Sequence, residues 1–169
     1  MLVRRMSWLL VAVLAVAGCG GPAGDSSADR PGAVASGPML AFTATTLDGK
    51  PFDGASLQGK PAVLWFWAPW CSTCLGQAPG VREAVARYGD RVAIVGVAGL
   101  DKTEAMPEFV RLAKVEGMTH LADEAGVVWK RFGVTEQSIF VLIDAGGQVT
   151  FRGRLDPHGI PDRVAALLG

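Results

Sequence analysis

The order of apolar and polar residues after residue 38 divides the chain into alternating strands and helices. Three runs are almost wholly apolar, as in strands that a sheet buries on both faces; they are Ala62 to Trp67, Arg91 to Val97 and Ile139 to Ile143. Between them, apolar residues recur every three or four positions, which indicates helices; these are expected at about Thr73 to Tyr88, from Thr103 to Gly117, at Ala125 to Phe132 and from Pro161 to Leu168. The alternation predicts an α/β domain with a central mixed β-sheet flanked by helices.

Turn residues mark two hairpins. Leu47-Asp48-Gly49 separates the extended runs 39–46 and 50–53, and Asp-Gly between such runs is a hairpin signal. The turn at residues 144–147 separates the Ile139 strand from a run at Val149 to Gly153, which predicts an antiparallel pair. A further short strand is expected at Thr119 to Ala122.

The helix expected at Thr73 to Tyr88 has one apolar face, made of Leu75, Ala78, Val81, Val85 and Tyr88. Pro79 lies inside this helix and should kink it, and Gly89 suits the C′ position. Pro161 is expected at N1 of the last helix, where proline is tolerated.

The start of the chain has the pattern of a secretory signal peptide. Arg4 and Arg5 precede an apolar core from Trp8 to Ala17, which is too short to span a bilayer comfortably. Val16-Ala17-Gly18-Cys19 resembles the bacterial lipobox, whose cysteine carries lipid and becomes the mature N-terminus. This predicts a lipoprotein signal peptide at residues 1–18 and lipidation at Cys19. The alternative is an ordinary signal peptide followed by an incidental cysteine.

The chain after the signal peptide falls into a linker and a domain. Residues 20–38 are rich in Gly, Ala, Ser, Pro and Asp and have almost no large apolar side chains, so with Cys19 they predict a flexible tether at 19–38. Residues 39–169 have a normal size for one domain. The formal net charge is zero and there is no basic stripe, which argues against nucleic-acid binding.

Three cysteines are present, and two of them form a CxxC motif. If Cys19 carries lipid, Cys71 and Cys74 are the remaining pair, at a junction between a strand and a helix. Residues i and i+3 of a helix face one another, so the two sulfurs can form a disulfide. A disulfide that closes so short a loop constrains the unfolded chain little, which favours a redox role over a structural one.

The expected positions of the two cysteines predict different roles. Cys71 should lie at or just before the first helical turn, where free N–H groups and the helix dipole stabilise a thiolate. Cys74 lies one turn further on, should be more buried, and would resolve a mixed disulfide. Pro69 and Trp70 are expected to form an apolar rim around the exposed sulfur.

A CxxC motif is also half of a zinc site, but a four-ligand site needs a second pair of ligands. The two histidines of the chain, His120 and His158, are expected to have surface or packing roles. A copper carrier would want a longer cysteine spacing and a histidine nearby. We therefore predict no bound metal.

The segment around the cysteines resembles a known family. GKPAVLWFWAPWCSTC, from Gly59 to Cys74, is similar to the active-site segment of the extracytoplasmic thioredoxin-like thiol-disulfide oxidoreductases TlpA, ResA and DsbE. FVLIDAGG, from Phe140 to Gly147, resembles their late strand and turn, and Pro79 matches the proline in the active-site helix of thioredoxin. The resemblance implies a thioredoxin-like fold with a helical insertion between the Arg91 and Ile139 strands, and no cofactor.

Two positions depart from the family pattern. The family has a cis-proline facing the disulfide, where this chain has Ser138 after Gln137. A cis bond before a non-proline residue costs about 3 kcal/mol, so we predict a trans Gln137–Ser138 bond. The Ser138 hydroxyl would then either bond to the Cys71 thiolate or face solvent. The Ser138 loop, together with Ser72 and Thr73 between the cysteines, would tune the stability of that thiolate.

The second departure is at Trp65, where thioredoxin has a buried aspartate that serves proton transfer to the inner cysteine. Trp65 is interpreted as an ordinary core residue. The proton acceptor must therefore come from elsewhere, and the nominal candidates are Glu83, Glu104 and Glu136.

The resemblance implies a lipid-anchored oxidoreductase on the extracytoplasmic side of the cell membrane. Its substrates would be cysteine-containing secreted proteins or apocytochromes, with a membrane electron donor or acceptor, and reductant or cytochrome-maturation duty is favoured. A thiol peroxidase of the peroxiredoxin group would need Pro-x-x-x-Thr-x-x-Cys, and neither cysteine of the motif has threonine three residues before it. A metal-binding or redox-weak, partner-docking lipoprotein remains the alternative, because Ser138 replaces the proline.

Overall fold

The computed structural model describes residues 38–169. The signal peptide, the Cys19 lipidation site and the tether up to residue 37 were predicted from sequence and lie outside the described residues.

The described part of the chain is built on a five-stranded mixed sheet in the order β5-β4-β3-β6-β7. The strands are β3 (Ala62–Trp67), β4 (Ala93–Ala98), β5 (Thr119–Ala122), β6 (Ile139–Ile143) and β7 (Val149–Gly153). β3 pairs in parallel with β4, and β4 with β5, whereas β6 is antiparallel to both β3 and β7. The predicted α/β class, the central mixed sheet and the antiparallel β6–β7 pair are confirmed.

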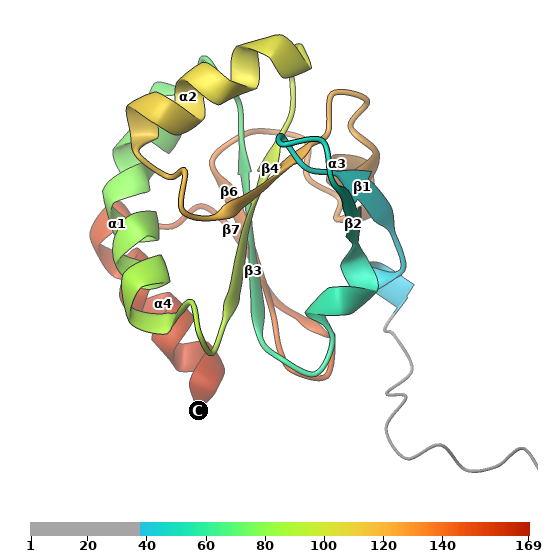
Figure 1. Ribbon diagram of the computed structural model, residues 1–169. Helices are drawn as coiled ribbons and strands as arrows, with labels where there is room; N and C mark the ends of the chain where they lie inside the picture. The colour runs from blue at the N-terminus through green and yellow to red at the C-terminus, as the bar shows by residue number, and fades with distance from the viewer. Residues whose placement is uncertain (1–37) are drawn as a thin grey trace, which may run out of the picture. The chain divides into compact units, whose positions relative to one another are not determined.

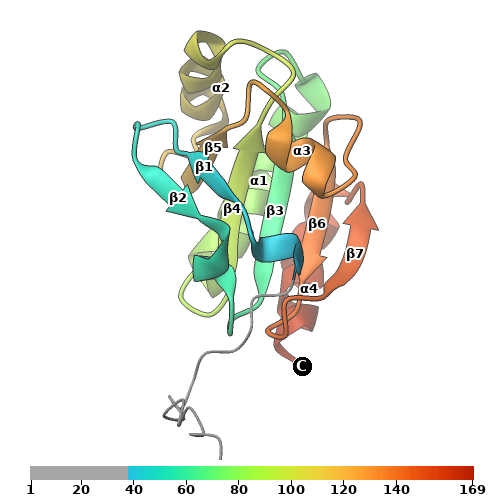
Figure 2. The ribbon, with the colours of Figure 1, turned by 90° about the vertical axis from the view of Figure 1, so that its right-hand side faces the viewer.

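Helices cover both faces of this sheet, as Figure 1 shows with the sheet nearly edge-on. α1 (Ser72–Tyr88), α2 (Met106–Ala113) and α4 (Ile160–Ala165) lie on one face, and α3 (Val127–Arg131) lies on the other. The second face also carries the predicted N-terminal hairpin of β1 (Thr43–Thr45) and β2 (Pro51–Asp53), which Figure 2 shows in front of the β5 and β4 side of the sheet. Short 3₁₀ turns complete the fold, at Pro38–Leu40, Gly54–Leu57, Thr103–Ala105, Pro157–Gly159 and Ala166–Leu168.

The central strand β3 divides the core into two layers. Successive side chains of a strand point to opposite faces, so Val63, Trp65 and Trp67 pack with α1, α2 and α4. Ala62, Leu64 and Phe66 pack with α3 and the N-terminal segments. A strand with two buried faces must be apolar at every position, which explains the continuous run from which it was predicted.

Three local expectations are wrong. The helix expected to end at Gly117 ends earlier: α2 stops at Ala113, and Lys114 after it adopts the left-handed conformation with φ of 56°. Gly89 has helical dihedrals instead of a left-handed cap. Leu75 is 41% exposed, because Cys74, Gln77 and Ala78 take the buried face at the start of α1.

Among the helices of residues 38–169, none has both the length and the apolar composition that a membrane span requires.

His120 has a packing role, as predicted. It is buried on β5, where its Nδ1 accepts a hydrogen bond from Trp67 Nε1 at 3.3 Å. Its Nε2 therefore carries the hydrogen and donates to the Val115 carbonyl at 3.0 Å. Both ring nitrogens are satisfied in the neutral form, and burial lowers the pKa of His120.

This burial predicts a pH dependence of stability. Below about pH 6.5 the unfolded chain protonates His120 while the folded chain resists, so the free energy of unfolding should fall as the pH drops, by at most about 1 kcal/mol between pH 6.5 and 5.5. Urea unfolding of the wild type and His120→Asn over this range measures it. The variant should be less stable at every pH and should lack this slope, and an equal slope in both proteins would contradict the assignment.

Candidate active site

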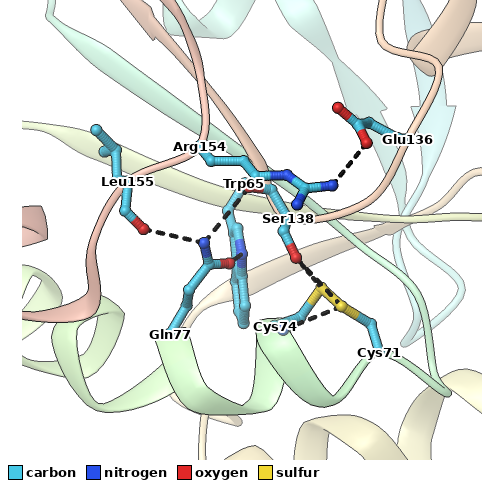
Figure 3. The surroundings of a disulfide bond; sticks show 8 residues. All are labelled: Trp65, Cys71, Cys74, Gln77, Glu136, Ser138, Arg154 and Leu155. Carbon is cyan, nitrogen blue, oxygen red and sulfur yellow. Dashed lines mark hydrogen bonds and ion pairs between the residues drawn. A yellow bond between two sulfur atoms is a disulfide. The ribbon is translucent and has the colours of Figure 1, made fainter.

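The two cysteines of the CxxC motif lie where β3 passes into α1. Cys71 is the N-cap of α1, and its Sγ accepts a hydrogen bond from the Cys74 backbone N–H at 3.0 Å. A disulfide joins Cys71 and Cys74, with an S–S distance of 2.13 Å (Figure 3). A sulfur that caps a helix in this way is stabilised as an anion once the disulfide opens, because the N–H and the helix dipole both favour negative charge.

Both cysteines are enclosed in the oxidised form. Cys74 is 0% exposed and Cys71 only 4%, so the order of burial is the expected one. The expectation that the Cys71 sulfur is exposed is wrong for this form, because Ser138 packs directly on both sulfurs. Little of Cys71 is therefore accessible to a substrate in this form.

The residues next to the cysteines form the rim of the site. Trp70 is 57% exposed and Pro69 is half-buried, which places the predicted apolar pair at the surface. The Trp70 Nε1 donates a hydrogen bond to the carbonyl of Leu100 at 3.3 Å. Leu100 is itself exposed and has a φ of 59°. Sequence reasoning missed it, because nothing in the loop after β4 marks it as a neighbour of the motif.

Ser72 and Thr73 lie in the first turn of α1, and both are exposed. They are therefore open to solvent and to a bound partner.

Ser138 faces the disulfide from the segment just before β6. Its Oγ lies 3.3 Å from Cys71 Sγ and 3.2 Å from Cys74 Sγ, and the residue is 1% exposed. The Gln137–Ser138 peptide bond is trans, as predicted. Of the two orientations considered for the hydroxyl, the structure has the one toward the sulfurs, and the contact includes both cysteines.

A buried glutamine, Gln77, joins the site to two other segments. Its Oε1 accepts a hydrogen bond from Trp65 Nε1 at 3.2 Å. Its Nε2 donates to the carbonyls of Ser138 at 3.4 Å and Leu155 at 3.1 Å (Figure 3). Trp65 is a core residue, as predicted, but its indole N–H needs this partner. Sequence reasoning missed Gln77; a polar residue on the cysteine-bearing face of a helix was the available signal.

Gln77→Leu should destabilise the fold by about 2–4 kcal/mol, because it leaves one buried N–H and two carbonyls without a partner while changing the volume little. Urea unfolding measures this loss. Gln148→Leu is the matched control, since Gln148 is exposed and its change should stay within about 0.5 kcal/mol. A loss at Gln77 as small as that of the control would contradict the bridging role.

The three glutamates considered as proton acceptors are all exposed. Glu83 pairs with Arg87 and Glu136 with Arg154, and the sulfurs have no hydrogen bond to any of the three within residues 38–169. In the same residues, no group of three or more His, Cys, Asp or Glu side chains is placed to hold a metal ion.

Comparison with known proteins gives a family match and a similar secreted protein. The model of the AhpC/TSA family matches residues 36–152. The soluble secreted antigen MPT53 of Mycobacterium tuberculosis is 46% identical over 144 residues, which cover 83% of this chain and 82% of the relative.

Two solved structures are similar in both fold and sequence. A structure of MTB dsbF in mixed oxidized and reduced forms has a TM-score of 0.74 and 50% identity, and covers 78% of this chain and 98% of its own. A secreted disulfide oxidoreductase of Mycobacterium tuberculosis, homologous to E. coli DsbE, has a TM-score of 0.70 and 44% identity, and covers 76% and 97%. These similarities confirm the thioredoxin-like fold.

Proposed function

The chain belongs to the AhpC/TSA family, and from this premise we propose that it is a lipid-anchored thiol-disulfide oxidoreductase that works outside the cytoplasm. Cys71 exchanges with the substrate and Cys74 resolves the mixed disulfide. The substrates are cysteine-containing secreted proteins or apocytochromes, and a membrane protein supplies or takes up the electrons.

The observation that carries this proposal is the disulfide at the N-terminus of α1, with its outer sulfur capping the helix. A purely structural disulfide would stabilise the fold little, because the loop that it closes is so short. A thiolate at a helix N-terminus, by contrast, is the attacking species of thiol–disulfide exchange. The secreted disulfide oxidoreductase with 44% identity supports the same chemistry.

Exchange proceeds in two displacements. In the direction of substrate reduction, the Cys71 thiolate attacks a substrate disulfide and releases one substrate thiol. Cys74 Sγ then attacks Cys71 Sγ, the bond between Cys71 and the substrate breaks, and the second substrate thiol leaves. The protein pair loses two electrons and the substrate disulfide gains two.

An insulin-reduction assay tests the activity. Reduced protein should precipitate insulin with turnover in the presence of a dithiol reductant. Absence of turnover, together with tight zinc binding by the reduced thiols, would replace this proposal by a metal-binding lipoprotein. Consumption of hydrogen peroxide without insulin reduction would favour a thiol peroxidase instead.

The direction of electron flow depends on the reduction potential of the Cys71–Cys74 pair. Reference values run from about −270 mV for thioredoxin to about −120 mV for the oxidant DsbA. We propose a reductant or cytochrome-maturation role, so a potential near the thioredoxin value is expected in a glutathione redox titration. A value near that of DsbA would reverse the assignment to an oxidant.

The anchor is tested separately in cells. Cys19 is proposed to carry the lipid, on the basis of the lipobox pattern. The wild-type chain should incorporate labelled palmitate and sediment with membranes, and Cys19→Ala should lose both properties. Incorporation of label into Cys19→Ala would refute lipidation at this residue.

A further inference from the structure

The buried sulfur of Cys74 has one side-chain hydrogen-bond partner within residues 38–169, the hydroxyl of Ser138. Cys74 is 0% exposed, so bulk water does not reach it in this form. The three glutamates that were candidates for its proton are exposed, and two of them, Glu83 and Glu136, are paired with arginines. Each cycle of exchange nevertheless adds a proton to Cys74 and removes it again.

The backbone of Ser138 is held in an unfavourable conformation at this point. Its φ of 68° is in the left-handed region, which costs a non-glycine residue about 1–2 kcal/mol. The chain maintains this conformation from both sides: the Ser138 N–H donates to the Phe66 carbonyl at 2.9 Å, and the Ser138 carbonyl accepts from Gln77. Strain that persists next to reacting atoms suggests a function for the residue that bears it.

The hydroxyl is placed to serve both sulfurs at once. Disulfide sulfurs carry no hydrogen, so in the oxidised form the Ser138 O–H is the donor to Cys71 and Cys74. In the reduced form the same distances allow a chain in which the Cys74 thiol donates to Oγ while the hydroxyl donates to the Cys71 thiolate. Such a chain moves a proton between the sulfurs without forming a serine alkoxide.

We propose that Ser138 is a catalytic proton relay for Cys74, an inference that rests on the exchange function proposed above. When a substrate thiol opens the disulfide at Cys71, the Cys71–Cys74 bond breaks, a bond from Cys71 to the substrate sulfur forms, and Ser138 gives its proton to the leaving Cys74 sulfur. In the same step Ser138 Oγ accepts the proton that the attacking substrate thiol loses, so no serine alkoxide forms. The reverse displacement returns the proton from Cys74 through Ser138 to the departing substrate thiol.

Two variants separate the hydroxyl from the backbone. Ser138→Ala removes the hydroxyl and keeps the strain, whereas Ser138→Gly removes the hydroxyl and suits the positive φ. Both are made in full-length protein that carries Cys19→Ser, so that Cys71 and Cys74 are its only thiols. The probe is oxidised glutathione: acid quench and mass spectrometry give the rate at which Cys71 gains glutathione and the rate at which Cys74 displaces it.

The displacement by Cys74 should slow in both variants on the order of 10²-fold at pH 6, the lower end of what a positioned proton-transfer group contributes. The loss should shrink as the pH rises, since hydroxide then replaces the relay, while the first attack by Cys71 should change much less. A Ser138→Gly variant as fast as wild type would overturn the relay, whether or not Ser138→Ala is slow. If wild type itself gains no glutathione, the exchange function fails instead.

Discussion

Cys71→Ser is expected to reduce the exchange activity to that of an assay without protein. The hydroxyl of serine does not ionise near neutral pH, so the variant has no nucleophile at the N-terminus of α1. The helix itself should be retained, because serine is among the best N-cap residues and can accept the same backbone N–H that Cys71 Sγ accepts. Insulin reduction measures the loss, and circular dichroism checks that the fold is kept.

Gln148→Leu is the control, because Gln148 is exposed and lies in the turn between β6 and β7, outside the residues expected to tune the thiolate. It should keep turnover of the same order as the wild type. Residual turnover in Cys71→Ser well above the background would mean that Cys74 can attack a substrate directly, which its complete burial argues against.

The strands were predictable where burial alone decides the sequence. β3 and β6 begin and end at the predicted residues, since their continuous apolar runs between turn residues have one reasonable placement. β5 and β7 also match their predicted bounds, whereas β4 begins two residues later and ends one residue later than predicted. The end of α2 was not predictable in this way. Lys114 adopts the left-handed conformation although Gly117 is available, and the buried Val115 that follows it bonds back to the Val110 carbonyl. Packing of Val115 thus overrides the local preference for glycine.

The site was predictable at the cysteines and less so around them. The spacing of Cys71 and Cys74 is local, so the helix that contains it is enough to bring the sulfurs together. Gln77 is buried because it bonds to Trp65, Ser138 and Leu155, from segments 12 to 78 residues away in the chain. Ser138 could be aligned to the site, but the direction of its hydroxyl depends on a φ that serine rarely adopts.

Gln77 and Ser138 together connect the position of the Ser138 hydroxyl to the core. Gln77 is one turn beyond Cys74 on α1 and fixes the Ser138 carbonyl, so a single helix carries both the reacting sulfurs and the group that orients their partner. In the proposed relay, this uncharged network takes the place of the buried aspartate that the resemblance to thioredoxin would put at Trp65. Proton transfer through such a network depends on geometry more than on the charge of one carboxylate.

Cys74→Ser is expected to stop turnover while preserving the first attack, so that a mixed disulfide between Cys71 and the substrate accumulates. The Cys71 thiolate is still stabilised by the backbone N–H of residue 74, which the substitution leaves in place. The serine hydroxyl cannot displace the substrate, and it can bond to Ser138 Oγ where the thiol did. Incubating the reduced variant with intact insulin, whose disulfides Cys71 can attack, should give a mixed-disulfide adduct on a non-reducing gel, removed by dithiothreitol and absent in Cys71→Ser. Release of substrate at the wild-type rate, with no adduct, would show that Cys74 is not the resolving residue.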